Sequence, residues 1–442
     1  MSEISIFFKI ANGKIKPMHA VNNGPMKASS VEQTRGNFDT FKAAKIPYVR
    51  NHDASFCSAY GGEHTVDVHA IFPDFTKNPY DPASYDFTLT DEYLNTITEA
   101  GSEVFYRLGS KIEHWSKKYG TIVPPDFKKW AVICEHIIRH YNEGWANGFR
   151  FGITYWEIWN EPDGKKSNGD QPNWSGTAQD FYELYEIAAA HLKSRFPHLK
   201  IGGPALSWLQ NGQWLDNFLT HLTRGGKRIP LDFFSWHAYP NDPYAIAKDA
   251  RFVREKLDSY GYTETETNLN EYNYLLNFTT RYVESIENII RERGAAFVAA
   301  AMCVGQASAL DMLMYYDARV ATVFNGMFDF YTLRPIKGYY PFVYFSELYT
   351  LGNAAQSSTD ADDIYSVAAS DGESAAAMVV YYPKEGVAAE SRTVTIQTDK
   401  PGKYQLRITD GDVTDAEKVI DAADGVITLE MQPNMFVLLK NA

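Results

Sequence analysis

Short apolar runs alternate with longer amphipathic stretches along the first 350 residues or so of the chain. Runs typical of buried strands lie at 16–21, 47–53, 103–108, 154–162, 199–204, 231–240, 266–273 and 311–317. Helical spacing of apolar residues connects them, over 33–44, 126–141, from 177 onward, 213–223, 244–260, 284–309 and 339–351. Gly294 is a candidate break within 284–309. Strands that alternate with helices in this way predict a parallel (β/α)8 TIM barrel.

The pattern changes after residue 351. Short alternating runs at 364–368, 376–382, 393–398, 404–409, 426–429 and 435–439 are separated by Gly, Pro, Asp and Asn. This pattern is typical of a small accessory antiparallel β-sandwich. We therefore predict a catalytic barrel over 12–351 and an accessory domain over 352–442, which the N-terminal strand within 1–11 joins. We expect the accessory domain to be structural, because it carries no separate aromatic cluster.

The strand at 154–162 ends in a polar tip. It reads Thr-Tyr-Trp-Glu-Ile-Trp-Asn-Glu-Pro, and Pro162 cannot continue a strand ladder. Asn160 and Glu161 therefore lie at the carboxyl end of the strand, where catalytic residues gather in a parallel barrel. Trp159 and Pro162 shield the Glu161 carboxyl group, and desolvation raises its pKa, as a general acid requires. The structural alternative is that both residues only cap the next loop.

A second carboxylate lies at the end of a later strand. Glu271 is the exit residue of the run at 266–273, which follows the helix at 244–260. Two carboxyl groups at the mouth of one barrel can divide acid/base and nucleophile roles when their environments separate their pKa values. Glu264 and Glu266 compete for the second role, but they lie earlier in the same stretch and away from its exit.

Other polar side chains cluster at strand ends. Arg50, His52 and Asp53 close the second strand, and an Arg at this position suits an ionised carboxylate. His237 and Tyr239 are two residues apart near the end of the sixth strand, so both point to the same side. The structural alternatives are an ion pair under the barrel mouth for Arg50 and a hydrogen-bonded core histidine for His237.

The run Trp159-Asn160-Glu161-Pro162, followed by the Ile-Gly-Gly-Pro-Ala stretch at 201–205, resembles glycoside hydrolase family 39 of clan A. That family includes β-xylosidases and α-L-iduronidases, and the resemblance spans most of the chain. It implies Glu161 on the fourth strand as acid/base and Glu271 on the seventh as nucleophile. One departure is Asn-Glu-Tyr around Glu271, where the family usually has Thr-Glu-Trp.

The resemblance also implies substrate-binding roles. Asn160 would hydrogen-bond the sugar 2-hydroxyl, and Tyr239 would hydrogen-bond the nucleophile. The loop at 109–115, which ends in Trp115, corresponds to one that lines the substrate site. Clan A barrels often place a Trp platform on the eighth strand, where this chain has Tyr315 and Tyr316. Either one of these tyrosines, which we assign as Tyr315, replaces the Trp, or the platform differs. We expect Arg50, His52 and His237 to contribute to the same site.

Composition excludes several other functions. A net charge of −13 argues against nucleic acid as a partner, which requires a clustered basic surface. No run of 18 or more uncharged apolar residues is present, so no membrane span is expected. The 3 cysteines lack metal-ligand spacing, and neither a phosphate-binding loop nor a Gly-x-Ser-x-Gly elbow occurs. We expect no metal and no cofactor.

Together these patterns predict a retaining glycoside hydrolase, β-xylosidase-like, acting on plant-type oligo- or polysaccharides. The expected partner is the carbohydrate substrate alone. A non-catalytic carbohydrate-binding protein on the same barrel and a transglycosidase are the alternatives. The start of the chain lacks a signal-peptide pattern, and the sequence leaves the compartment and the oligomeric state open.

Overall fold

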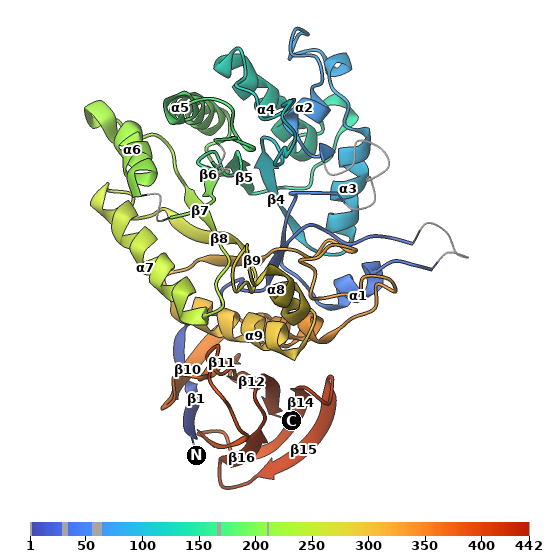
Figure 1. Cartoon of the computed structure of the whole chain (residues 1–442), viewed down its shortest axis with the longest axis vertical. Coiled ribbons are helices and arrows are strands. Elements are labelled where there is room, and N and C mark those ends of the chain that lie inside the picture. The colour runs from blue at the N-terminus through green and yellow to red at the C-terminus, as the bar shows by residue number, and fades with distance from the viewer. Residues whose placement is uncertain (1, 29–33, 55–63, 166–168, 210–211, 442) are drawn as a thin grey trace.

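The computed structural model describes residues 2–28, 34–54, 64–165, 169–209 and 212–441. Gln33, at the start of the first predicted helix, and Cys57 lie outside the described residues. Figure 1 shows a barrel ringed by helices above a smaller sheet, with both chain ends in the smaller part.

The barrel confirms the predicted fold class. Eight parallel strands close in chain order, namely β2 (Ala20–Asn22), β3 (Tyr48–Arg50), β4 (Glu103–Leu108), β5 (Tyr155–Ile158), β6 (Lys200–Leu206), β7 (Phe233–Ala238), β8 (Glu266–Tyr272) and β9 (Met312–Tyr315).

The helices around the barrel are α1 (Phe38–Ala43), α2 (Val68–Ile71), α3 (Thr88–Glu99), α4 (Phe127–Asn142), α5 (Ala178–Arg195), α6 (Gly212–Thr223), α7 (Pro243–Ser259), α8 (Tyr282–Ile289), α9 (Glu292–Ala307) and α10 (Tyr340–Leu351). Short 3-10 turns are η2 (Pro82–Ser84), η3 (Trp145–Asn147), η4 (Arg224–Gly226) and η5 (Lys337–Tyr339). Among the described helices, none is both long enough and apolar enough to cross a bilayer.

The helix predicted over 284–309 is two helices. α8 ends at Ile289 and α9 begins at Glu292, so the helix is interrupted shortly before Gly294. The two helices pack closely there, because a Cβ atom at Gly294 would lie 2.6 Å from the Asn288 carbonyl oxygen. This close packing at the break requires glycine at position 294, because a side chain would not fit there.

The barrel interior changes from apolar to polar toward the carboxyl ends of its strands. Phe105, Tyr155 and Phe233 pack together in a lower layer. Two residues farther along two of these strands, the inward positions are Glu157 and Ser235, both fully buried. The apolar layer closes the barrel, and the polar layer forms the floor of its open end.

The smaller part is one mostly antiparallel sheet of nine strands in the order β15-β14-β17-β12-β11-β10-β1-β13-β16. β1 lies between β10, its antiparallel neighbour, and β13, its parallel neighbour. β15 and β16, at opposite ends of this order, contact each other, so the sheet curls around its own core. The strands are β1 (Ser2–Lys14), β10 (Asn353–Thr359), β11 (Ile364–Ser370), β12 (Ala375–Tyr381), β13 (Arg392–Thr398), β14 (Gly402–Thr409), β15 (Ala416–Ala422), β16 (Val426–Met431) and β17 (Met435–Asn441).

The sequence missed two of these strands for different reasons. β10 reads Asn-Ala-Ala-Gln-Ser-Ser-Thr, whose small and polar residues show no apolar alternation. β15 lies at the edge of the sheet and is mostly exposed, so burial imposes little pattern on it.

The sheet packs on the barrel through α9 and α10, which contact β11 and β12. Figure 1 shows α9 between the two parts. β12 is buried along its whole length. Met378 and Val380 belong to the barrel's hydrophobic core, whereas Ala377 and Val379 belong to the core inside the sheet. Burial on both faces explains why this strand is an unbroken apolar run.

Candidate active site

Glu161 leaves the end of β5 through a sharply turned backbone. Trp159 and Glu161 have φ angles of 78° and 47°, in the left-handed region that non-glycine residues seldom adopt. The turn is tightly packed, since a Cβ atom at Gly109 would lie 2.9 Å from the Trp159 Cα atom. The Glu161 amide donates to the Ala205 carbonyl oxygen at 2.8 Å. β6 therefore holds Glu161 in place.

Two side chains contact the Glu161 carboxyl group. Its Oε1 atom lies 2.7 Å from His237 Nδ1, and Asn173 Nδ2 donates to its Oε2 atom at 2.7 Å. Burial raises the pKa of Glu161, and the opposing influence of His52 and of Asn173 does not reverse the shift. Burial lowers the pKa of His237 to about 4, so its imidazole is neutral near pH 7. This environment favours the protonated form of Glu161.

Glu271 lies near the end of β8 among hydrogen-bond donors. Arg50 Nη1 is 2.8 Å from its Oε1 atom, and the Tyr239 hydroxyl donates to its Oε2 atom at 2.9 Å. His237 Nδ1 lies 3.4 Å from Oε2, and His52 Nε2 lies 3.6 Å from Oε1. Arg50 and Tyr239 thus hold both oxygens of this buried carboxylate.

The two carboxyl groups face each other. One carboxylate oxygen of Glu161, one of Glu271 and a ring nitrogen of His237 all lie within 4.8 Å of one another. A pair at this spacing can act on one bond, because one group can attack a carbon atom while the other protonates the oxygen that leaves it.

Arg50 links four strands of the barrel. It is fully buried, and besides Glu271 it donates to Glu157 Oε2 at 2.6 Å, Asn22 Oδ1 at 3.1 Å and Asn160 Oδ1 at 2.7 Å. Both interpretations of Arg50 from the sequence therefore apply, since its side chain forms a buried ion pair with Glu157 and also binds the carboxylate of Glu271. Its bond to Asn160 fixes the orientation of that carboxamide.

Glu157 is a site residue that the sequence analysis missed. Its Oε1 atom accepts hydrogen bonds from Ser235 Oγ at 2.6 Å and Asn270 Nδ2 at 2.5 Å, opposite its ion pair with Arg50. A charged residue within an apolar strand was the available signal. Glu157 balances part of the charge of the buried Arg50 guanidinium group. Without Glu157, the Glu271 carboxylate would have to balance that charge alone.

A second charged cluster surrounds Asp53. Lys111 Nζ lies 3.1 Å from its Oδ1 atom, and Arg319 Nη1, His52 Nδ1 and the Tyr316 hydroxyl lie 3.2–3.4 Å from its Oδ2 atom. Burial alone would raise the pKa of Asp53, but His52 and Arg319 outweigh it and hold that pKa well below its usual value. The sequence indicated His52 and Asp53, the loop that contains Lys111 and the Tyr315–Tyr316 pair, but not Arg319.

Tyr315 does not line the site, so that prediction is wrong. Its hydroxyl donates to the Phe324 carbonyl oxygen and accepts from the Gly326 amide, both at 2.9 Å, within the core. The next residue, Tyr316, lies on the other side of the strand end. Its ring meets His52 edge-on at 5.8 Å between ring centroids. Tyr316 is the tyrosine that stands at the barrel mouth.

The loop at 109–115 includes His114, whose charge lowers the pKa of Glu161 slightly against the larger, opposite effect of burial. Trp115 is 63% exposed, and its carbonyl oxygen accepts from Lys118 Nζ. Contact between the Trp115 ring and a sugar stays a prediction.

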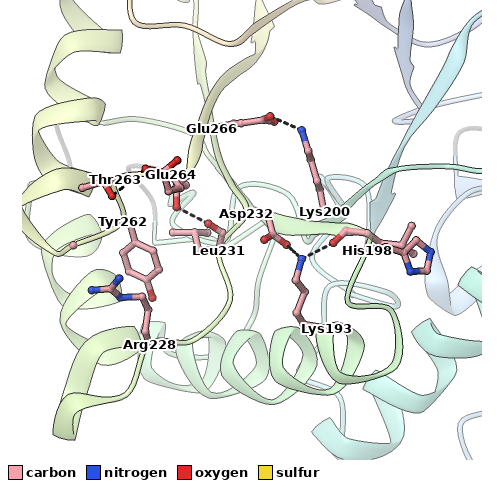
Figure 2. Close-up of a pocket in the computed structure, with 13 residues that line it drawn as sticks. Lys193, His198, Lys200, Arg228, Leu231, Asp232, Tyr262, Thr263, Glu264 and Glu266 are labelled. Atoms are coloured by element: carbon pink, nitrogen blue, oxygen red, sulfur yellow. Dashed lines mark hydrogen bonds and ion pairs between the residues drawn. The ribbon is translucent and has the colours of Figure 1, made fainter.

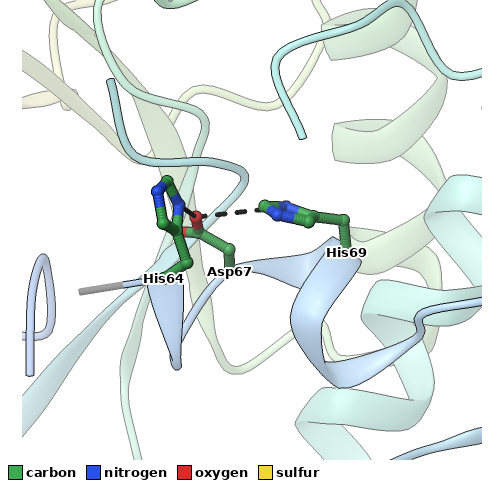
Figure 3. A group of neighbouring side chains, drawn as sticks. All are labelled: His64, Asp67 and His69. Atoms are coloured by element: carbon green, nitrogen blue, oxygen red, sulfur yellow. Dashed lines mark hydrogen bonds and ion pairs between the residues drawn. The ribbon is translucent and has the colours of Figure 1, made fainter. Parts of the chain in front are cut away.

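Asp67 anchors the start of this loop. Its Oδ1 atom accepts from Arg107 Nη2 at 2.6 Å and from the Lys111 amide at 3.0 Å. Figure 3 shows Asp67 between His64 and His69, whose Nδ1 atoms lie 2.7 and 3.9 Å from Oδ2. Arg107 balances the Asp67 charge, and the cluster positions Lys111 beside Asp53.

Glu264 and Glu266 are not rivals of Glu271. Glu266 begins β8, and with Glu264 it lines a cavity of about 390 Å³ at the amino-terminal end of the barrel strands (Figure 2). There Glu266 accepts from the Tyr155 hydroxyl at 3.0 Å and pairs with Lys200. Such pairs serve stability, because the chemistry of a parallel barrel lies at the opposite end.

A comparison with protein families decides the affiliation of the chain. The sequence model of Glycosyl hydrolases family 39 matches residues 42–262, half of the chain. The chain belongs to glycosyl hydrolase family 39. The match includes Glu161 and His237 and ends before Glu271.

Curated relatives of this family 39 chain match only in part. A β-xylosidase of Geobacillus stearothermophilus is 29% identical over 171 residues, which cover 35% of this chain and 31% of that protein. A human α-L-iduronidase is 28% identical over 181 residues, 35% of this chain and 24% of that protein. The alignments therefore span about a third or less of the relatives' length.

Solved structures share the whole fold of this family 39 chain. A glucosidase from Croceicoccus marinus superposes with a TM-score of 0.81 at 21% identity, over 100% of this chain and 98% of that one. A monomeric β-xylosidase from Caulobacter crescentus CB15 has a TM-score of 0.70 at 17% identity, over 100% and 99%. At these identities the likeness concerns the fold alone.

Proposed function

We propose that this chain is a retaining glycoside hydrolase that cleaves β-xylosides, with Glu271 as nucleophile and Glu161 as acid/base. One observation carries the proposal, namely the carboxylate oxygens of Glu161 and Glu271 within 4.8 Å of each other. Retaining enzymes keep their two carboxyl groups roughly 5–5.5 Å apart, whereas inverting enzymes leave roughly 6.5–9.5 Å for a water molecule.

In the first step a carboxylate oxygen of Glu271 bonds to the anomeric carbon, and the bond from that carbon to the leaving oxygen breaks. The proton of Glu161 moves to the leaving oxygen. Arg50 and Tyr239 aim the attacking carboxylate through their bonds of 2.8 and 2.9 Å. Burial raises the pKa of Glu161, so this group holds its proton for the step.

In the second step the Glu161 carboxylate takes a proton from water. The water oxygen bonds to the anomeric carbon as the ester bond to Glu271 breaks. Two inversions at one carbon give net retention of configuration. Asn160, oriented by Arg50 at 2.7 Å, is placed to hydrogen-bond the sugar 2-hydroxyl.

The sugar in this proposal comes from the β-xylosidase relatives, and plant-type oligo- or polysaccharides would supply it. The cluster of His52, Asp53 and Lys111 next to Glu271 offers charged groups to sugar hydroxyls. A sugar-binding protein without catalysis is disfavoured, because both carboxylates keep their hydrogen-bond partners. A transglycosidase would form the same covalent intermediate and differ in the acceptor alone.

The test is hydrolysis of an aryl-glycoside panel by the wild type, Glu271→Gln and the control Glu264→Gln. The panel holds the β-xyloside, α-L-arabinosides, β-glucoside, β-galactoside and α-L-iduronide. We expect the β-xyloside to be cleaved with retention, the Glu271 variant to be inactive and the exposed Glu264 control to match the wild type. Inverted product, or full activity in Glu271→Gln, would refute the mechanism.

A further inference from the structure

A cleft of about 550 Å³ opens beside the two carboxylates. His237 and Tyr239, which contact Glu161 and Glu271 respectively, form its inner end. Its outer end is bordered by Trp208, on the loop after β6, and Phe278, on the loop after β8. Because β7 lies between β6 and β8, these two aromatic residues come from loops on either side of His237.

The cleft approaches Glu161 through His237. His237 lines it and lies 2.7 Å from Glu161, the group that protonates the leaving oxygen. The charged residues Asp53 and Lys111, on the loops after β3 and β4, do not line it. A substrate whose scissile oxygen meets Glu161 would therefore extend its leaving group into the cleft.

Two polar side chains of the inner wall are already engaged. The Ser207 hydroxyl donates to Asp163 Oδ2 at 3.0 Å, and the Tyr239 hydroxyl donates to Glu271. His237 Nε2 is buried and makes no hydrogen bond within the described residues, and Leu209 and Pro240 add apolar groups to the wall. Charged side chains return only on α7 at the outer end, where Lys248 and Asp249 lie. The wall thus offers contact area more than hydrogen bonds.

The two aromatic rings present large free surfaces. Trp208 is 61% exposed and Phe278 is 62% exposed, so a ligand in the cleft can reach both rings. The Phe278 ring continues the aromatic wall from Tyr239, at 5.5 Å between ring centroids and 74° between planes.

The loop that carries Phe278 is held in place. The Asn277 side chain accepts from the Thr279 and Arg281 amides, each at 2.9 Å. Arg281 pairs at 2.8 Å with Glu385, which lies beyond β12 in the smaller sheet. The accessory sheet therefore helps to position one wall of the cleft.

We propose that this cleft is the leaving-group subsite and that Trp208 and Phe278 select glycosides with an aryl or otherwise apolar aglycone. The inference rests on the proposed glycosidase function. Aromatic surfaces bind apolar groups through area and ring contact, so they raise kcat/KM only for substrates that carry such a group.

The experiment compares leaving groups of similar reactivity on one sugar. The methyl, n-hexyl and 2-phenylethyl β-D-xylosides and xylobiose all release alcohols, and β-D-xylosyl fluoride carries no aglycone. We expect the wild type to prefer the 2-phenylethyl over the methyl xyloside by about 10-fold or more in kcat/KM. Trp208→Ala and Phe278→Ala should each reduce this preference several-fold, largely through KM, and leave the fluoride unchanged.

Tyr80→Ala is the matched control, because Tyr80 is 65% exposed and packs on His136, away from the cleft. It should change none of these values. The proposal is overturned if xylobiose is preferred over the 2-phenylethyl xyloside and loses as much in Trp208→Ala, since the cleft would then accept a sugar. An equal loss on the fluoride would also overturn it.

Failure of the proposed function gives a different result. If no glycoside and no fluoride is cleaved, calorimetric binding of 2-phenylethyl 1-thio-β-D-xyloside to the wild type and to Trp208→Ala still decides the role of the cleft. Binding that weakens in the variant supports an apolar subsite. Binding that is absent, or equal in both, overturns it.

Discussion

Arg50 on β3 binds Glu271 on β8, with Nη1 2.8 Å from Oε1, although 221 positions separate the two residues in the sequence. The guanidinium group also pairs with Glu157 at 2.6 Å, and none of these three side chains is more than 7% exposed. The proposed nucleophile is thus built into the polar floor of the barrel.

Arg50→Lys should therefore separate geometry from charge. An ammonium group cannot reproduce four directed contacts, so Glu271 should lose its alignment and kcat should fall by roughly 10²-fold. Arg50→Ala leaves two buried carboxylates unpaired and should lower the free energy of unfolding by about 3–5 kcal/mol. Steady-state kinetics and urea denaturation measure both. Wild-type kcat in Arg50→Lys would show that the contact does not orient the nucleophile.

Glu271→Ala tests the nucleophile directly. Its removal should lower kcat by roughly 10⁴-fold or more. Added azide fits the space left by the side chain and should restore turnover of an activated aryl β-xyloside, giving the glycosyl azide of inverted configuration. Product NMR reads the configuration. A rescued product of retained configuration would mean that the two carboxylates have exchanged roles.

The alkaline limb of the pH–rate profile should belong to Glu161. Burial raises its pKa, and the reaction needs its protonated form, so activity is present below that pKa and is lost as the pH rises through it. Glu161→Gln should lack this limb. The variant should still react in the first step with β-D-xylosyl fluoride, which needs no acid. An unchanged alkaline limb would remove Glu161 from the acid role.

His237 should not produce a limb in the same range. Burial lowers its pKa to about 4, so the imidazole is uncharged both slightly below and slightly above pH 7.

Met378→Ala tests whether the barrel and the sheet unfold together. The side chain is fully buried in the barrel's core although it belongs to β12, so its loss should cost about 2–5 kcal/mol. Calorimetry should show a single transition at a lower Tm. Val419→Ala, at a 65% exposed position on β15, is the control and should change stability by less than about 0.5 kcal/mol. A separate early transition in Met378→Ala would mean that the sheet unfolds alone.

Much of the fold could be predicted because its signals are local. Alternation of apolar runs and amphipathic stretches predicted the barrel, and Thr177 with Asp180 forms a capping box at the start of α5. Pro162 ended the fourth strand and put Glu161 at its mouth. Strand order alone put Glu271 on the seventh. The edge strand β15 was not predicted, because an exposed strand carries no pattern of burial.

What the sequence by itself determined was the kind of fold and the two carboxylates, because strand ends and strand order follow from patterns within a few residues. Only the tertiary structure decided which of Tyr315 and Tyr316 faces the site, since one position along a strand turns a side chain to the opposite face. Only barrel closure brought Arg50 to Glu157 and Glu271. Contacts between residues more than 100 positions apart leave no spacing for a pattern to reveal.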